Sequence, residues 1–397
     1  MSSDPLRIEP RRAPSPFAFI AFGFRPFFLL GALSGVVLMM VWVAAYTTGC
    51  FLPNYYGLAQ WHAHEMLFGF IGAIIAGFLL TAPAVWTERP MPRGLPLAGL
   101  VVLWTSARIA PFFPGQVPSA VQIVLDVSFL PCIALVVFRV VWQARQWRNA
   151  VFPILLLAMG GANALAHAQI RTESGAAAGT ELMLYLVLLL VSILAGRVIP
   201  FFTRARIQDA NSQVRGWVEV AATGSLLLLI PADLLGAPAG VVAGVALLAG
   251  TAHLLRLAGW YSGGIWRVPL LWVLYVAYGW LVAGFLLKAL SLLTALNPTL
   301  ARHAFTTGGI GGIVVGMMCR ISLGHTGRPL RASRATVIVF VLMNVSAGVR
   351  VVLPVLFPSW YLMWIRSSAA LWVAAFAVFL VVYAPVLWRP RADGRPG

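Results

Sequence analysis

The sequence predicts an all-α integral membrane protein with about twelve transmembrane helices and both termini in the cytoplasm. Three observations predict this class. Its 397 residues are 60% apolar and only 10% charged, too few charges to cover a soluble protein. Apolar runs of roughly 20 residues, the length that crosses a bilayer, recur along the chain. Arginines concentrate in alternate loops between these runs, which predicts the orientation.

The apolar runs form one membrane domain, residues 17–388, between cytoplasmic tails at residues 1–16 and 389–397. No linker inside this domain is long enough to separate further domains. The predicted spans are residues 22–47, 62–86, 95–113, 118–142, 151–170, 180–202, 216–236, 239–259, 268–294, 303–321, 335–356 and 361–388.

Loop charges support this count independently. With the N-terminus inside, nearly all loop arginines fall in cytoplasmic segments, and the opposite loops contain little beyond Arg171 and Arg302. The net charge of +17 comes from arginines placed singly or in small groups between spans. Because they form no stripe, they indicate a lipid bilayer as the partner and no nucleic acid. The three cysteines are far apart and predict no disulfide framework.

Six histidines fall near the two predicted membrane faces. The external face has four, which are His62, His64, His167 and His303. The cytoplasmic face has two, which are His253 and His325. Because neutral imidazole is the commonest metal ligand, such groups are candidate transition-metal sites. His167 has two interpretations, an interfacial polar anchor or a ligand.

The stretch WHAHEMLFGF, residues 61–70, places two histidines and Glu65 at the start of an apolar span. Ionisable groups at this depth need solvent or a partner, and a metal is the predicted partner of His62 and His64. Residues two apart lie about 200° around a helix and would point to different centres. In an extended loop both could bind one ion, and the sequence leaves the two arrangements open.

His303 and His325 are 22 residues apart, so a continuous helix separates them by about 33 Å. The glycines between residues 308 and 316 could break that helix, but close helix packing is their favoured interpretation. We therefore expect two centres at different depths. The external centre would use His62, His64 and His303, and the cytoplasmic one would use His253 and His325.

Several arginines lie at or within spans and need anionic partners. These are Arg25, Arg108, Arg197, Arg320 and Arg350. The buried carboxylates Asp126, Glu181 and Glu219 are one source of partners. The propionates of a haem are another, because guanidinium matches a carboxylate in two hydrogen bonds. Arg320 and Arg328 flank His325, which favours an inner haem with His253 and His325 as its ligands. The external group then suits copper or a second, open haem.

The segments FGFRPFFLLGAL, WHAHEMLFGF, GRVIPFFT, HLLRLAGW and HAFTTGGIGGIVVGMMCRISLGHTGRPL resemble the NnrS family of bacterial twelve-span membrane proteins. The resemblance implies haem and copper, a role in nitric oxide metabolism and protection from nitrosative stress, and the bacterial inner membrane. It marks His62, His64, Glu65, Met66, Arg197, Pro200, His253, His303, Arg320, His325 and Arg328, whereas His167 lies outside these segments. Because no C-x-x-C-H occurs, the expected haem is non-covalent haem b.

These observations favour a haem and copper protein that binds or converts a small nitrogen species such as nitric oxide, and that is an oxidoreductase if it turns over. Two alternatives remain open, a transporter of a metal or metal complex and a haem sensor without turnover. Transporters place their binding sites near the midplane. The predicted histidines lie near the membrane faces instead, which favours fixed redox sites.

Overall fold

The computed structural model describes residues 18–50, 56–170 and 177–395. Within these ranges it contains twelve helices long and apolar enough to cross a membrane, so the predicted fold class and span count are confirmed. The predicted N-terminal tail, residues 1–16, lies outside the described residues, as does Arg171. That both termini face the cytoplasm stays a prediction.

The described elements are α-helices with short 3-10 or π-helical segments, labelled η, between or within them. The first half contains α1 (Phe24–Thr48), α2 (Leu58–His64), η1 (Glu65–Ile71), α3 (Gly72–Leu79), α4 (Ala82–Thr87), α5 (Leu95–Ile109), η2 (Ala110–Phe112), α6 (Ser119–Gln143), η3 (Trp147–Asn149), α7 (Val151–Gln169) and α8 (Ala177–Arg206). The second half contains α9 (Gly216–Leu234), α10 (Ala239–Trp260), η4 (Gly263–Arg267), α11 (Pro269–Leu293), α12 (Thr299–His303), η5 (Ala304–Ile310), α13 (Gly311–His325), α14 (Arg334–Val351), α15 (Leu353–Leu356), η6 (Pro358–Trp360) and α16 (Tyr361–Trp388).

The predicted span limits lie within four residues of the observed ones. Two of the differences move candidate site residues. The second span begins at Leu58 after Gly57, and the tenth begins at Thr299 after Pro298. His62 and His303 therefore lie about one turn inside their helices, and not at the first residue as predicted.

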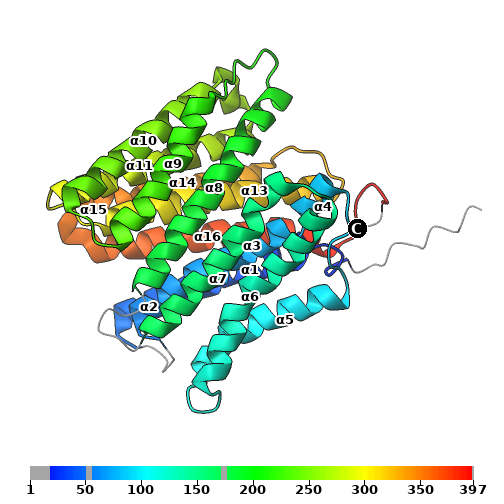
Figure 1. Ribbon diagram of the computed structural model, residues 1–397, viewed down its shortest axis with the longest axis horizontal. Coiled ribbons are helices and arrows are strands. Elements are labelled where there is room, and N and C mark those ends of the chain that lie inside the picture. Colours follow the sequence, from blue (N-terminus) through cyan, green and yellow to red (C-terminus); the bar gives the residue numbers. More distant parts are fainter. Residues whose placement is uncertain (1–17, 51–55, 171–176, 396–397) are drawn as a thin grey trace, which may run out of the picture.

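The helices form one bundle, with α2 and α15 at one end and α4 and the C-terminus at the other (Figure 1). Helices α6, α7 and α8 pack in sequence, as do α9, α10 and α11, while α16 packs against both α1 and α14. The backbone N–H of Ala18 donates to the carbonyl of Trp388 at 3.1 Å. The two ends of the membrane domain therefore meet on one face of the bundle.

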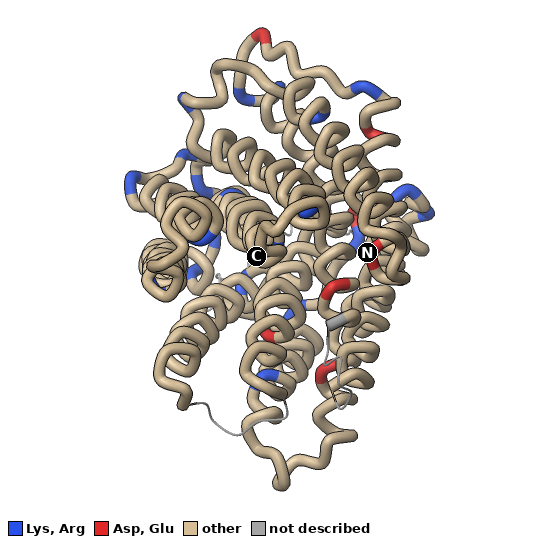
Figure 2. Tube along the Cα trace, turned by 90° about the vertical axis from the view of Figure 1, so that its left-hand side faces the viewer, with Lys and Arg blue, Asp and Glu red and all other residues tan. Residues whose placement is uncertain are grey.

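Charged residues lie both around the outline of the bundle and among its central helices (Figure 2). The three predicted buried carboxylates each have an arginine partner. Asp126 pairs with Arg108, as expected for an arginine inside a span. The other two pair with arginines that were not on the list of intramembrane arginines, Glu219 with Arg256 and Glu181 with Arg302.

Two spans contain a π-helical segment, and each segment follows a histidine directly. Segment η1 begins after His64, and η5 begins after His303. The helix of the tenth span continues without a break from Thr299 to His325, so these two histidines lie at its opposite ends. Its glycines pack closely: a Cβ on Gly308 would lie 2.4 Å from Trp280, for example. The packing interpretation is thus confirmed.

Candidate metal centre

The six histidines occupy four environments in place of the two predicted groups. These are a cavity lined by His62 and His303, a polar cluster that contains His64 and His167, the α10–α11 contact that contains His253, and the end of α13, where His325 lies. The structure therefore brings His62 together with His303 but places His64 elsewhere.

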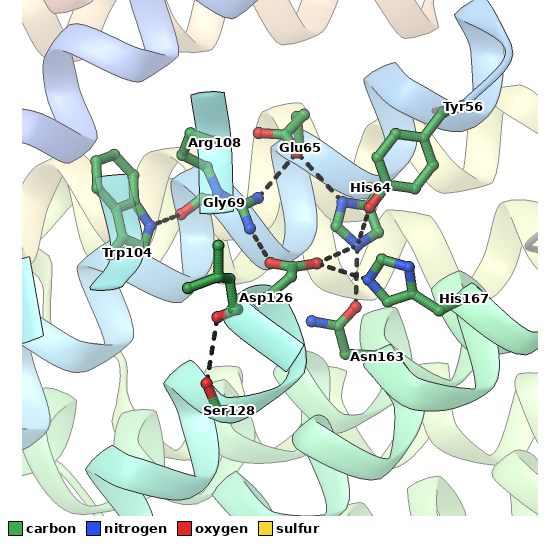
Figure 3. A network of polar contacts seen from close by, with 11 residues as sticks. Tyr56, His64, Glu65, Gly69, Trp104, Arg108, Asp126, Ser128, Asn163 and His167 are labelled. Atoms are coloured by element: carbon green, nitrogen blue, oxygen red, sulfur yellow. Dashed lines mark hydrogen bonds and ion pairs between the residues drawn. The ribbon is translucent and has the colours of Figure 1, made fainter. Parts of the chain in front are cut away.

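The polar cluster is centred on Asp126 of α6 (Figure 3). The Nε2 atoms of His64 and His167 each lie 3.0 Å from Oδ2 of Asp126. All three side chains are buried, and their potential ligand atoms lie within 4.8 Å of one another. Metal–ligand bonds of about 2.0–2.2 Å place neighbouring ligand atoms about 3 Å apart, so this spacing suits one metal ion.

The surroundings of His64 add a second reason to expect a cation here. Its Nδ1 lies 3.3 Å from Oε1 of Glu65, and when Nδ1 donates its proton to that carboxylate, Nε2 is left with a lone pair. This Nε2 faces Asp126, the amide oxygen of Asn163 at 3.0 Å and the hydroxyl of Tyr56 at 3.2 Å. A lone pair cannot bond to carboxylate or amide oxygens, whereas a cation between these atoms would satisfy them.

Arg108 of α5 connects the two carboxylates of the cluster. Its Nη1 donates to Oε1 of Glu65 at 2.9 Å, and its Nη2 pairs with Asp126. Gly69 leaves the space that this guanidinium needs, because a Cβ there would lie 2.9 Å from Nη1 of Arg108. Trp104 holds the same glycine by donating to its carbonyl at 3.0 Å. With both carboxylates ionised, one negative charge remains, which favours a bound cation.

Local helix geometry brings these residues together. Asn163 and His167 are four residues apart and therefore share one face of α7. Glu65 follows His64 and begins the π-helical turn of η1, so both side chains point into the same interior. Such turns often occur at functional sites.

A cavity of about 410 Å³ is lined by residues on another face of α2. The ring of His62 stacks on Trp42, with centroids 4.2 Å apart, and Met66 lines the cavity four residues further on. His303 lies across from them on α12 and donates from Nδ1 to the carbonyl of Thr299 at 2.7 Å. Its Nε2 therefore has a free lone pair, the state of a metal-binding imidazole.

Charge in this cavity favours an anionic group. Arg302 and Arg350 both line it, opposed by one carboxylate, Glu181, which lies 3.4 Å from Nε of Arg302. Arg350 donates from Nη2 to the hydroxyl of Tyr361 at 3.3 Å. Its Nη1 is buried and has no hydrogen-bond partner among the described residues. A ligand with carboxylates would satisfy these guanidinium groups.

His253 lies in a closely packed polar network. Its Nδ1 lies 2.6 Å from the hydroxyl of Tyr278, and its ring stacks on Phe285. Arg256 donates to the same hydroxyl at 3.1 Å and also pairs with Glu219. His253 does not line the cavity that contains His62 and His303.

His325, the predicted partner of His253, lies at the end of α13. Its ring packs 5.7 Å from Phe24 of α1, and its carbonyl accepts from Arg391 at 2.9 Å. Nothing in the contacts of either histidine joins them within the described residues. The expected inner pair is therefore not brought together, because His253 lies seven residues before the end of α10, inside the bundle.

The arginines predicted to bind a cofactor also contact protein groups. The guanidinium of Arg320 lies over Phe202, 3.5 Å from the ring centroid, while its Nη1 is buried without a hydrogen-bond partner among the described residues. Arg197 donates to Oδ1 of Asn149 at 2.9 Å. Arg328 follows the tenth span and donates to the carbonyl of Thr326 at 3.4 Å. Burial lowers the pKa of Arg328, and the nearby charge of Arg389 lowers it further.

Sequence reasoning missed most partners of His64. From the sequence, Asp126 is expected only to neutralise an arginine, His167 has two interpretations, and nothing marks Tyr56 as a partner. One signal was available, since Asn163 and His167 are polar residues four apart within an apolar span.

The bundle and its buried cluster define a multi-pass helical membrane protein with a candidate metal site. The sequence model of the family described as NnrS protein matches residues 18–391, nearly the whole chain. The chain therefore belongs to the NnrS family. No curated protein matched it in a sequence comparison.

Proposed function

We propose that this chain is a haem- and copper-binding membrane protein of nitric oxide metabolism or nitrosative-stress protection. The observation that carries the proposal is the buried group of His64, Asp126 and His167, which has the spacing of metal ligands. Membership of the NnrS family supports the choice of haem and copper. Two imidazoles and a carboxylate without a thiolate suit copper among several transition metals.

In this proposal, the metal ion at the polar cluster is bound by His64, His167 and Asp126. Glu65 orients His64 by accepting its Nδ1 proton, as carboxylates commonly do for metal-binding histidines. Arg108 holds Glu65 and Asp126 in place. Asn163 and Tyr56 provide further oxygens beside the same Nε2 atom.

The cavity between α2 and α12 is the proposed haem site. Its residues fit the group: His62 and His303 offer imidazoles, while Arg302 and Arg350 offer guanidiniums for two propionates. Its volume of about 410 Å³ falls within the usual range for cofactor sites. A haem bound there would supply an iron centre that takes a small ligand such as nitric oxide. The chain fixes His303 through Thr299 and His62 through Trp42.

The test is metal analysis and a pyridine haemochrome assay on the purified wild type and single His→Ala variants. We expect His64→Ala to lose copper and His62→Ala to lose haem, each while remaining folded in the membrane. His325→Ala is the control and should keep both. Wild-type metal content in both His62→Ala and His64→Ala, or no metal in the wild type, would overturn the proposal.

The proposed location is the bacterial inner membrane, with both termini in the cytoplasm. The arginine bias of the loops supports this orientation. A reporter that is active only in the cytoplasm should function when fused after Gly397. Activity there of a reporter that requires the periplasm would reverse the orientation.

A further inference from the structure

A second cavity of about 80 Å³ lies between helices of the bundle. It is lined mainly by α3, α8 and α13, with side chains such as Ile74, Leu190 and Met317. Every described residue that lines it is apolar, and most of these are buried. Water needs polar partners in such a space, and a cavity lined in this way stays dry.

Two residues line both cavities, namely Ile71 and Ile310. Both are buried, Ile71 at 5% exposure and Ile310 at 1%. Each is also the last residue of a π-helical segment, Ile71 of η1 and Ile310 of η5. The two helices that carry His62 and His303 therefore also form the boundary between the cavity of these histidines and the apolar one.

The size and lining of the apolar cavity select the kind of molecule that it holds. Charged groups are excluded because nothing in the lining compensates for their lost hydration. An apolar cavity of about 150 Å³ holds benzene or xenon, so about half that volume suits a molecule of two or three atoms. Such molecules also enter hydrocarbon more readily than ions do.

We propose that this cavity is an apolar antechamber, which holds a small uncharged gas molecule and passes it to the cavity of His62 and His303 between Ile71 and Ile310. The proposal rests on the proposed function only for the metal at its destination. Binding in the antechamber depends on the apolar lining alone. The antechamber and the proposed function can therefore be disproved independently of each other.

Xenon is the first probe, because it binds apolar cavities whether or not a metal is present. Xenon NMR on the purified full-length protein should show a saturable internal site. Ile71→Phe and Ile310→Phe should each weaken that binding at least about tenfold, since the larger ring fills the neck. Ile338→Phe is the matched control, because Ile338 is 51% exposed on α14, and it should bind xenon as the wild type does.

The second readout is the rate at which carbon monoxide binds the reduced, haem-containing protein after flash photolysis. We expect Ile71→Phe to slow association about tenfold and Ile71→Ala to accelerate it. Thermal unfolding checks that each variant is folded, and Ile71→Ala supplies the opposite change if the larger ring is not tolerated.

Two results would overturn the antechamber. One is an absence of saturable xenon binding in the wild type, and the other is wild-type rates in both Ile71→Ala and Ile71→Phe. If the protein contains no haem but binds xenon in the predicted manner, the proposed cofactor is wrong and the antechamber stands. If haem is present but xenon does not bind, the antechamber is wrong and the proposed function stands.

Discussion

His62 and His64 are separated by one residue, yet they belong to opposite kinds of environment. The side chain of His64 is fully buried and surrounded by polar groups of η1, α6 and α7 and by the hydroxyl of Tyr56, which precedes α2. His62 lines a cavity and stacks on Trp42. Because α2 is helical at this point, the two imidazoles point in different directions, as the helical alternative required.

The buried cluster of His64, Asp126 and His167 is a closed site, whereas the cavity lined by His62 and His303 is an open site. In the His64 cluster, the ion pairs of Arg108 with Glu65 and Asp126 hold helices together, so removal of a carboxylate there affects the fold as well as any bound metal. In the cavity, Nη1 of Arg350 has no hydrogen-bond partner among the described residues, and the Nε2 of His303 carries a free lone pair. A change there should affect binding more than stability.

The largest expected effect is that of Asp126→Ala in the closed site. Removal of this carboxylate leaves Arg108 buried without one of its two anionic partners, and breaking a buried pair costs about 3–5 kcal/mol. We expect a large loss of folded protein, measured by thermal unfolding in detergent and by yield from membranes.

Glu181→Ala is the matched control for Asp126→Ala in the open site. Its carboxylate is 20% exposed and lies 3.4 Å from Arg302, so its removal should cost about 1 kcal/mol or less. Equal destabilisation by the two variants would show that the distinction between a closed and an open site is wrong.

The second prediction concerns the open site. His303→Gly should reduce cofactor retention at least about tenfold, because it removes an imidazole whose free nitrogen faces the cavity. Added imidazole should restore part of the retention, since the glycine leaves the space of the missing ring. Absorption spectroscopy after gel filtration measures both effects.

His325→Gly is the control for this rescue, because His325 packs against Phe24 and does not line the cavity. It should keep the cofactor, and added imidazole should make no difference. A loss in His325→Gly together with full retention in His303→Gly would return the haem to the inner position predicted from the sequence.

The sequence could predict the spans but only part of the two sites. Hydropathy located all twelve spans, because bilayer thickness fixes helix length. Helix periodicity required His62 and His64 to point apart if the segment is helical, but the sequence left that condition open and assigned both histidines to one external centre. The sequence could not predict that His64 and His167 meet at Asp126. Their meeting depends on how α2 and α7 pack, and these helices are separated by about 100 residues of chain. The π-helical turns that end at Ile71 and Ile310 had no recognised sequence signal.

The third prediction compares Gly69, beside the closed site, with Gly99 on α5. Gly69→Ala should destabilise the protein by about 1–3 kcal/mol, because the new Cβ would meet Arg108 at 2.9 Å and Glu65 at 3.0 Å. Gly99→Ala on α5 meets no atom within 4 Å and should stabilise the helix by up to about 1 kcal/mol. Thermal unfolding of the two variants measures the difference. If they behave alike, the guanidinium does not depend on the space at Gly69.

The smallest expected effect is that of an arginine–carboxylate pair outside the membrane, Arg391 and Asp393. Arg391 donates from Nε to Asp393 at 2.9 Å, which is the main reason that the pKa of Asp393 falls to about 2. A lowered pKa contributes stability above the ordinary range of an aspartate, and this contribution is lost as the pH falls towards about 2. Because the carboxylate is in solvent, Asp393→Asn should change the melting temperature at pH 7 by little more than the error of the measurement. The difference from wild type should also disappear as the pH is lowered. A large change at pH 7, comparable to that of Asp126→Ala, would mean that burial is not what makes the Arg108 pair essential.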